Sequence, residues 1–398
     1  MSAADTNPPN NVESMSKMAP DRTGSTAAQG NDTPNEMHVS AKPSIRDGRR
    51  KSLVMTGGTS GIGRRIVERL LAEYADWRII LFARPSVRSR ELCGLRGSER
   101  LTVIDADLAS LKSVDCACDE VICSLDPLGI DAIVLNAGVQ TVSQDAASVD
   151  GLELAFAVNF LAHFLIVERL KNHVRSGGRI VSTSSEVHDP DAFCLMGISR
   201  ATWQDPAILA DPVRAQQSIL SIVDRGEARY CASKLLNLMH IRYLAKEMPA
   251  VDIVAYNPSV VPGTEIARDR NWMQRLGWNY VMPLVSPILP GTRSLEQSSG
   301  DLLWLLTDAD TQSMSGNYVD GREIKPGSLE SRDRVKIART VEVARWLIDD
   351  RLGKNRGSKE MHRQGLKLEF SDKANLPEIV IDGTGNVEHS HPGGRYSA

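Results

Sequence analysis

The chain has 398 residues, of which 41% are hydrophobic and 24% are charged, and its formal net charge is −3. It is long enough to bury a large core, and its nearly balanced charge gives no basic bias toward nucleic acid. No run approaches the ~18 apolar residues of a membrane span, and the N-terminus lacks the basic-then-apolar plan of a secretory signal. These features predict a cytoplasmic protein with no nucleic-acid partner and no integral membrane segment.

The N-terminal segment, residues 1–48, contains no Leu, Phe, Trp or Tyr and is rich in Ser, Thr, Asn, Pro and Ala. Such a segment cannot bury enough apolar surface to offset the entropy lost on ordering, so we predict a disordered tail. Acidic residues recur early in it, which argues against an organellar transit peptide.

The six cysteines are scattered, and the closest three are Cys116, Cys118 and Cys123. They lack paired CxxC spacing and fall in a stretch that also has the pattern of an amphipathic helix with Val114, Cys118 and Val121 inward. We therefore predict buried thiols and no metal site.

Regular structure is predicted to begin abruptly at residues 52–55, a short apolar strand. It runs into the turn Thr56-Gly57-Gly58-Thr59-Ser60-Gly61-Ile62-Gly63 and then into a helix with Ile66, Leu70 and Leu71 inward. Glycines let the backbone turn sharply and approach a pyrophosphate, while the helix N-terminus offers unpaired N–H groups and a positive dipole. This strand, turn and helix predict nucleotide binding.

The second predicted strand, residues 78–84, ends where the adenosine ribose of a dinucleotide should lie. An acidic residue there would accept hydrogen bonds from a free 2′-hydroxyl and repel a 2′-phosphate. Ala83 and Arg84 stand there instead. A guanidinium suits a phosphate, so NADPH is favoured over NADH, although a solvated arginine at a strand end is the alternative interpretation.

Strands and helices alternate along the rest of the chain, which predicts a parallel sheet with its ligand across the carboxyl ends of the strands. We predict a single α/β domain over residues 49–352, Rossmann-like and doubly wound, with a predominantly parallel sheet and helices on both faces. Residues 353–398 are predicted to be a C-terminal extension, partly disordered. The further elements expected are strands at 101–104, 130–135, 179–185, 251–256 and 316–319, and helices at 152–170, 295–306 and 332–352.

Tyr230 and Lys234 stand one helical turn apart, which puts a phenol and an amine on one helix face. A phenol titrates near ~10 and exchanges protons at neutral pH only if its phenolate is stabilised, as a nearby ammonium would do. The pair therefore indicates a proton-transfer device, although ordinary amphipathic helices show the same spacing. Asn159 falls on the apolar helix 152–170, where it needs hydrogen-bond partners as a structural bracket or as part of a relay.

Together these motifs resemble the short-chain dehydrogenase/reductase family, over roughly residues 52–349. The set comprises the TGxxxGxG turn (Thr56, Gly57, Gly61, Gly63), Asp107-Leu108, Asn136-Ala137-Gly138, Asn159, Ser184-Ser185 and YxxxK (Tyr230, Lys234), in the order of the family. The Val158-Asn159-Phe160 context, His188 and the long interval between Ser185 and Tyr230 are most similar to the retinol dehydrogenase and protochlorophyllide oxidoreductase branch.

The resemblance implies a role for each catalytic residue. Tyr230 would be the general acid for a carbonyl oxygen, or the base in the reverse direction. Lys234 would lower the pKa of Tyr230 and hold the nicotinamide ribose. Ser185 would hydrogen-bond the substrate oxygen, and Asn159 would support a water that reloads the proton.

The resemblance also implies a set of cofactor-binding residues, which includes Tyr230 and Lys234. The others are Gly57, Ser60, Gly61, Ile62 and Gly63 at the pyrophosphate, Arg84 at the 2′-phosphate, Asp107 and Leu108 beside the adenine, Asn136 along the riboses and Thr264 at the carboxamide. One departure concerns the last contact, because Ser259 replaces the usual glycine after Pro258 and Thr264 is displaced by one position. We expect a reshaped nicotinamide loop rather than a lost one.

Two long connections, residues 186–229 and 265–293, are predicted to form the substrate site as lids or binding loops. The second carries Trp272, Met273, Trp278, Tyr280 and Met282. These side chains predict a bulky hydrophobic small-molecule substrate, although core packing or a contact between subunits of a homo-oligomer explains them equally well.

The hypothesis is an NADPH-dependent oxidoreductase that reduces a carbonyl group or oxidises the alcohol. One alternative is reduction of a conjugated C=C bond. Another is a non-catalytic NADP-binding sensor or scaffold, against which the intact Tyr230, Lys234, Ser185 and Asn159 argue.

Overall fold

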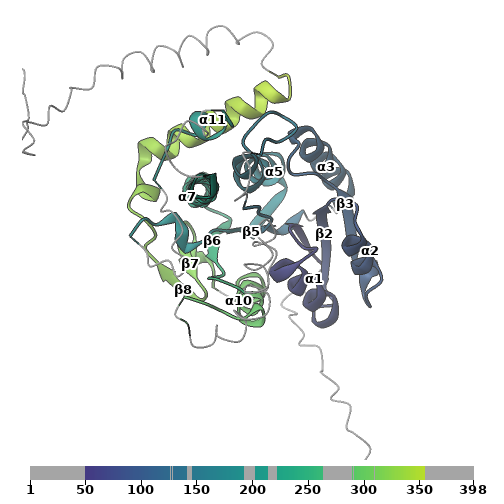
Figure 1. Cartoon of the computed structure of the whole chain (residues 1–398). Coiled ribbons are helices and arrows are strands. Elements are labelled where there is room, and N and C mark those ends of the chain that lie inside the picture. The colour runs from purple at the N-terminus through teal and green to yellow at the C-terminus, as the bar shows by residue number, and fades with distance from the viewer. Residues whose placement is uncertain are drawn as a thin grey trace, which may run out of the picture. The chain divides into compact units, whose positions relative to one another are not determined.

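The computed structural model describes residues 50–125, 127, 129–140, 146–191, 202–213, 222–262, 289, 291–308 and 310–354. All of them belong to one compact unit, residues 41–398. Strands and helices alternate along this part of the chain (Figure 1). Most of the predicted substrate loop 265–293 lies outside the described residues, as do residues 192–201 and 214–221 of the loop 186–229, the N-terminal tail and most of the C-terminal extension.

In the described part of the chain, eight strands form one sheet in the order β3-β2-β1-β4-β5-β6-β7-β8. Neighbouring strands are parallel except β7 and β8, which are antiparallel. The order reverses between β1 and β4, which is the switch point where doubly wound sheets bind ligands. The Rossmann-like, predominantly parallel architecture is thus confirmed. The strands are β1 (Lys51–Thr56), β2 (Trp77–Ala83), β3 (Leu101–Asp105), β4 (Ile130–Leu135), β5 (Val174–Thr183), β6 (Asp252–Asn257), β7 (Tyr318–Asp320) and β8 (Glu323–Lys325).

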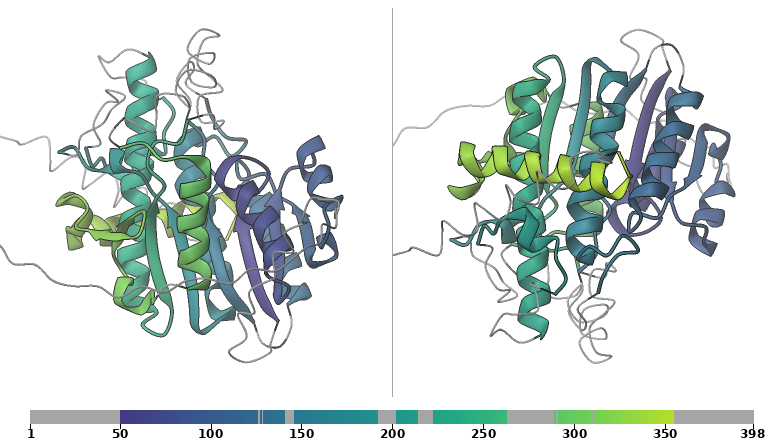
Figure 2. Two further views of the ribbon diagram at one scale, coloured as in Figure 1. Left: turned by 90° about the horizontal axis from the view of Figure 1, so that it is seen from below. Right: turned by 90° about the horizontal axis from the view of Figure 1, so that it is seen from above.

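Helices cover both faces of the sheet, α3, α5 and α7 on one and α1 and α10 on the other (Figure 1). Helix α11 runs crosswise over the first layer, as Figure 2 shows. The helices are α1 (Gly61–Glu73), α2 (Val87–Cys93), α3 (Leu111–Ser124), α4 (Leu154–Phe156), α5 (Ala162–Leu170), α6 (Pro206–Leu209), α7 (Ile222–Glu247), α10 (Leu295–Thr307) and α11 (Arg334–Arg351).

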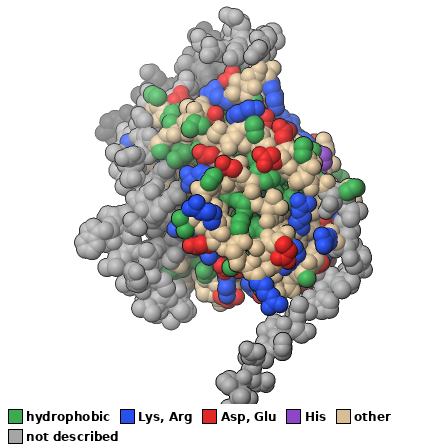
Figure 3. Space-filling model, turned by 90° about the vertical axis from the view of Figure 1, so that its right-hand side faces the viewer, with side chains coloured by type: hydrophobic (Ala, Val, Ile, Leu, Met, Phe, Trp, Pro, Cys, Tyr) green, Lys and Arg blue, Asp and Glu red, His purple; other side chains and the backbone are tan. Residues whose placement is uncertain are grey.

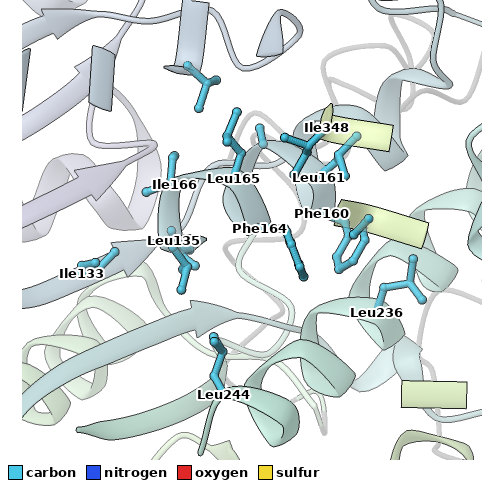
Figure 4. Close-up of a cluster of buried hydrophobic side chains, with 14 of the residues drawn as sticks. Ile133, Leu135, Phe160, Leu161, Phe164, Leu165, Ile166, Leu236, Leu244 and Ile348 are labelled. Carbon is cyan, nitrogen blue, oxygen red and sulfur yellow. The ribbon is translucent and has the colours of Figure 1, made fainter. Parts of the chain in front are cut away.

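Most of the core of the described domain lies in two apolar clusters, one on each face of the sheet. Every residue of β4 is buried, as expected for a parallel strand covered on both faces. Figure 4 shows the larger cluster, where Phe160 and Phe164 lie among Leu135 of β4, Leu236 of α7 and Ile348 of α11. Burying each such side chain contributes roughly 1.5–3 kcal/mol. The two clusters therefore fix the helices that carry the site.

The helix predicted over residues 152–170 is interrupted by a π-helical turn, Ala157–Leu161, which contains Asn159. The widened turn accompanies a long-range contact, because the side-chain amide of Asn159 is bonded to the main chain of Val139. Such turns within α-helices are frequent at functional sites.

Three further details differ from expectation. Strand β5 begins at Val174, and its pairing with β4 shifts register between Ile130 and Ala132. Strand β8 was not predicted, since three exposed residues carry no apolar pattern. Burial raises the pKa of the Cys118 thiol to about 12, whereas Cys116 and Cys123 are exposed, so the prediction of buried thiols is wrong for those two.

The surface agrees with the balanced composition. Figure 3 shows basic and acidic side chains interspersed on the side of the described domain that carries α2 and the β3 edge. Within the described ranges, no helix is both long enough and apolar enough to cross a membrane.

Candidate active site

The glycine-rich turn packs tightly against the end of β4. Gly57 has φ +69°, and a Cβ added to it would lie 2.7 Å from the Ala137 nitrogen. A Cβ on Gly63 would lie 2.1 Å from the Gly57 carbonyl oxygen. Asn136 donates from Nδ2 to the same oxygen over 3.0 Å. A side chain at either glycine would therefore break the turn.

The N-terminus of α1 opens onto this turn. Ser60 is the N-cap residue, but its side chain makes no capping hydrogen bond, and the first turn of the helix carries no acidic residue. The N–H groups of Gly61, Ile62 and Gly63 lack intrahelical partners because they stand in the first turn. Free N–H groups, the positive end of the helix dipole and a cradle without side chains fit a pyrophosphate.

The predicted adenosine end lies at the neighbouring strands. Arg84 follows β2 directly, its side chain is exposed, and it forms no salt bridge with any described residue. Asp107 accepts a hydrogen bond from the Ala109 N–H over 3.1 Å, and Leu108 is partly buried against the core. Arg64, in contrast, is paired with Glu68 and Glu91. Arg84 is thus the freer cation of the two.

Tyr230 and Lys234 both lie on α7 and are buried, with 6% and 3% of their surfaces exposed. The Lys234 ammonium donates to the Thr183 carbonyl over 2.9 Å and lies 5.5 Å from the centroid of the Tyr230 ring. The structure therefore brings the pair together at the end of β5.

Burial is the main cause of the pKa shifts of Tyr230 and Lys234. It lowers the pKa of Lys234 to about 8, because the charged ammonium loses its hydration. Burial also raises the pKa of Tyr230, with smaller raising contributions from Cys231 and Glu186. The expected lowering of the Tyr230 pKa by Lys234 is therefore not found in this structure, since the ammonium is engaged with Thr183 while the phenol is desolvated.

The side chain of Asn159 connects two segments by hydrogen bonds. Its Oδ1 accepts from the Val139 N–H over 2.8 Å, and its Nδ2 donates to the Val139 carbonyl over 2.9 Å and to Ser233 Oγ over 3.0 Å. The side chain thus joins the segment after β4 to α7. Its main-chain carbonyl accepts from Nδ1 of His163 over 3.0 Å.

A continuous hydrogen-bonded path links the glycine turn to Lys234. Asn136 bonds Gly57 through Nδ2, Thr183 Oγ1 donates to Asn136 Oδ1 over 3.2 Å, and the Thr183 carbonyl accepts from Lys234. A Cβ on Gly138 would lie 3.7 Å from Lys234 Nζ and 3.6 Å from Asn159 Oδ1. The glycine turn, Asn136, Asn159 and Lys234 therefore lie close together at this end of the sheet.

The two serines after β5 differ in their surroundings. Ser184 is buried and donates from Oγ to the Lys234 carbonyl over 3.2 Å. Ser185 is half-buried, and its hydroxyl makes no hydrogen bond to any residue in the described part of the chain. Of the pair, only Ser185 keeps a hydroxyl available to a ligand.

In the segment after β6, a serine adopts a backbone conformation that usually requires glycine. Ser259 has φ +61°, the left-handed region. Asn257 Oδ1 accepts from its N–H over 3.0 Å, and its Oγ donates to Asp320 over 3.4 Å. Thr264 lies outside the described residues.

Three residues of this site were not assigned from the sequence. Thr183 and Ser233 adjoin motif residues but have no motif of their own, so only the tertiary contacts identify them. His163 follows Asn159 by four positions on an otherwise apolar helix, a signal that could have indicated a shared face. Its Nε2 accepts from Thr56 Oγ1 over 2.9 Å, and burial lowers its pKa to about 3.

Comparisons with known proteins agree with this geometry. A family model described as short chain dehydrogenase matches residues 51–193. Similar proteins include a short-chain dehydrogenase, iccH, of Talaromyces variabilis (26% identity, covering 72% of this chain and 92% of that protein). Retinol dehydrogenase 14 of Homo sapiens is 28% identical (75% and 84%), and the chloroplastic protochlorophyllide reductase of Pisum sativum is 26% identical (81% and 83%). The structure of an NADPH-bound carbonyl reductase from chicken fatty liver shares the fold, with a TM-score of 0.51 at 17% identity (70% and 99%).

The sheet order and the glycine turn are those of a dinucleotide-binding domain of the Rossmann type. The chain is thus similar to short-chain dehydrogenases over residues 51–193, and retinol dehydrogenases and protochlorophyllide reductases are among the proteins that it resembles.

Proposed function

We propose that the protein is an NADPH-dependent reductase of a bulky hydrophobic carbonyl compound, or the dehydrogenase of the corresponding alcohol. The observation that carries the proposal is the hydrogen-bonded path from Gly57 through Asn136 and Thr183 to Lys234. It joins a turn suited to a pyrophosphate to a buried phenol and amine. We assign residues 49–352 to the catalytic domain, with both tails outside it.

The cofactor would lie across the carboxyl ends of the strands. Its residues would be Gly57, Ser60, Gly61, Ile62 and Gly63 at the pyrophosphate, Asp107 and Leu108 at the adenine, Asn136, Tyr230 and Lys234 along the riboses and Thr264 at the carboxamide. The bound nicotinamide would supply the hydride. Arg84 supports NADPH over NADH, because an exposed guanidinium at the end of β2 can pair with a 2′-phosphate.

Tyr230 would protonate the carbonyl oxygen. Because burial raises its pKa, the phenol holds its proton at neutral pH, and this suits a general acid in the direction of reduction. Ser185 would donate a hydrogen bond from its unengaged hydroxyl to the same oxygen as negative charge develops there. Lys234 would hold the ribose, and Asn159 would fix the loop at Val139 and support the water that restores the proton.

A second candidate is reduction of a conjugated C=C bond. Similarity to the protochlorophyllide reductase of Pisum sativum supports this alternative. In that case Tyr230 would deliver its proton to carbon, and the carbonyl of the substrate would be retained.

The test is to incubate the purified protein with NADPH and, one at a time, trans-retinal, decanal, menadione and progesterone. Loss of reduced-nicotinamide absorbance would be followed, and the products identified by mass spectrometry and NMR. We expect NADPH-dependent formation of an alcohol from at least one carbonyl. A product with a saturated C=C bond would favour the second candidate. Absence of NADPH binding by the folded protein would overturn both.

A matched pair of variants tests whether the glycine turn binds NADPH. Gly57→Ala should abolish NADPH binding, because its Cβ would collide with the Ala137 main chain. Gly177→Ala is the control, since Gly177 also has a positive φ but has nothing within 4 Å of its added Cβ. Equal NADPH affinity in the two variants would mean that the glycine turn does not hold the cofactor.

A further inference from the structure

His188 lies in the short 3-10 turn η4 (Glu186–His188) directly after Ser185. Only 1% of its surface is exposed. Both ring nitrogens are bonded to main-chain atoms. Nδ1 lies 2.5 Å from the Ser185 carbonyl oxygen, and Nε2 lies 3.2 Å from the Ser328 nitrogen. The ring therefore bridges Ser185 to a segment about 140 residues further along the chain.

These partners leave the ring a single tautomer. A carbonyl oxygen can only accept, so the Nδ1–H group of His188 donates to Ser185. A backbone N–H can only donate, so Nε2 accepts from Ser328. A ring whose two nitrogens both face main chain has no access to substrate, which excludes a role in proton transfer. Burial also lowers the pKa of His188, consistent with this neutral form.

The Ser185 carbonyl lies beyond the hydrogen bonds of the sheet. Strand β5 ends at Thr183, and the next bond toward β6 runs from the Ser184 N–H to the Tyr256 carbonyl over 2.8 Å. After that point, the carbonyl of Ser185 accepts only from His188, from its backbone N–H over 3.2 Å and from its ring, among the described residues. His188 thus holds the backbone of Ser185, and this backbone sets the direction of the Ser185 hydroxyl.

The other end of the bridge is firmly anchored. The Pro326 carbonyl accepts from Arg242 over 2.7 Å and from Arg332 over 2.6 Å, and Ser331 Oγ donates to the Ser328 carbonyl over 2.6 Å. These bonds fix residues 326–332, which we call the C-terminal turn, against α7.

Gly327 lets the C-terminal turn approach the ring closely. It has φ +65°, and a Cβ added to it would lie 3.2 Å from His188 Nε2 and 3.0 Å from Leu238 of α7. The ring of His188 also packs on Tyr318, with the ring centroids 4.5 Å apart. Since α7 carries Tyr230, the bridge ties Ser185 to the element that bears the proposed acid.

We infer that His188 is a positioning residue for Ser185. Its ring connects the Ser185 carbonyl to the C-terminal turn and thereby keeps the Ser185 hydroxyl directed at the same substrate oxygen as Tyr230. The inference rests on the proposed function, because it requires that Ser185 contacts the substrate. It extends the site to residues 326–332, beyond the segment that the family model matches.

Two amide substitutions separate the two halves of the bridge. His188→Asn keeps a donor near the position of Nδ1 and loses the contact to Ser328, whereas His188→Gln keeps an acceptor near Nε2 and loses the donor to Ser185. Turnover of the best carbonyl from the panel named above would be measured with NADPH, together with NADPH affinity and the melting temperature. Because small misplacement of a reacting group costs up to ~10²-fold, we expect His188→Gln to lower kcat by about tenfold. His188→Asn should stay within about threefold of wild type, and NADPH affinity should change in neither variant.

Ser185→Ala and the double variant Ser185→Ala/His188→Gln complete a cycle. If His188 acts through Ser185, the double variant should be no slower than Ser185→Ala alone. Equal activity of the Asn and Gln variants, or a further loss in the double variant, would refute the inference while leaving the proposed function intact. Wild-type turnover by Ser185→Ala would instead remove the proposed role of Ser185. The ¹⁵N spectrum of histidine-labelled protein tests the bridge without any substrate, since the His188 signals, assigned by their loss in His188→Asn, must be those of a neutral Nδ1–H tautomer.

Discussion

Replacing Lys234 by Met should make the cofactor-free protein more stable while abolishing its activity. The ammonium of Lys234 is buried and donates a hydrogen bond to the Thr183 carbonyl, and burial lowers its pKa from 10.5 to about 8. A methionine has a similar length and no charge, so it removes the desolvation penalty without leaving a large cavity.

The size and sign of the effect follow from the pKa of Lys234 in the two states. Below pH 8 both states bind the proton, and the folded state bears the full penalty, about 3 kcal/mol for a pKa lowered from 10.5 to about 8. Between pH 8 and 10.5 the unfolded state binds more protons, so the stability of the wild type rises with pH and the penalty is progressively relieved. The advantage of the variant should therefore fall by about 2 kcal/mol between pH 7 and pH ~9.5. Loss of the bond to Thr183 offsets about 1–2 kcal/mol at all pH values.

Urea unfolding of wild type and Lys234→Met at these two pH values measures the difference directly. Lys112→Met is the control, because Lys112 is exposed on α3 and its removal should change stability little at either pH. A difference between wild type and Lys234→Met that does not shrink with rising pH would refute the reasoning that the ammonium is held at a cost in the folded protein.

Other predictions concern stability and cofactor choice. Ser259→Val should lower the free energy of unfolding by about 1–2 kcal/mol, because a β-branched residue is strained at φ +61°, whereas Ser259→Gly should be nearly neutral; equal melting temperatures would contradict this. Arg229→Met should cost about 3 kcal/mol by removing the guanidinium that lies 3.2 Å from the buried carboxylate of Glu153, and adding Glu153→Gln should recover at least about 1 kcal/mol; additive losses in a double-mutant cycle would show that the pair is not coupled. Arg84→Asp should shift the ratio of kcat/KM for NADPH over NADH by at least about tenfold toward NADH, and an unchanged ratio would assign the 2′-phosphate to another cation.

The sheet and the nucleotide turn could be predicted because their signals are local. Strand β4 was predicted with its observed bounds, since a buried parallel strand is a continuous apolar run. The need for glycine at Gly57 and Gly63 could likewise be anticipated, although only the structure shows which atoms exclude a side chain.

The features that were missed depend on contacts between distant segments. The π-helical turn at Asn159 accompanies bonds to Val139, and the conformation of Ser259 is supported by a bond to Asp320. The prediction that the pKa of Tyr230 is lowered was wrong. Coulomb attraction to Lys234 can be inferred from the spacing of the two residues, whereas desolvation depends on the whole packed environment.

We propose that Tyr230 delivers the proton, whereas the glycine turn and Lys234 hold the cofactor. Tyr230→Phe removes only the phenolic hydroxyl, and Tyr243→Phe is the control, because the Tyr243 hydroxyl lies on the same helix and bonds Arg345 instead. We predict that Tyr230→Phe binds NADPH within about twofold of wild type but reduces the best carbonyl of the panel at least ~10²-fold more slowly, while Tyr243→Phe is unchanged in both. Turnover near that of wild type in Tyr230→Phe would contradict the account.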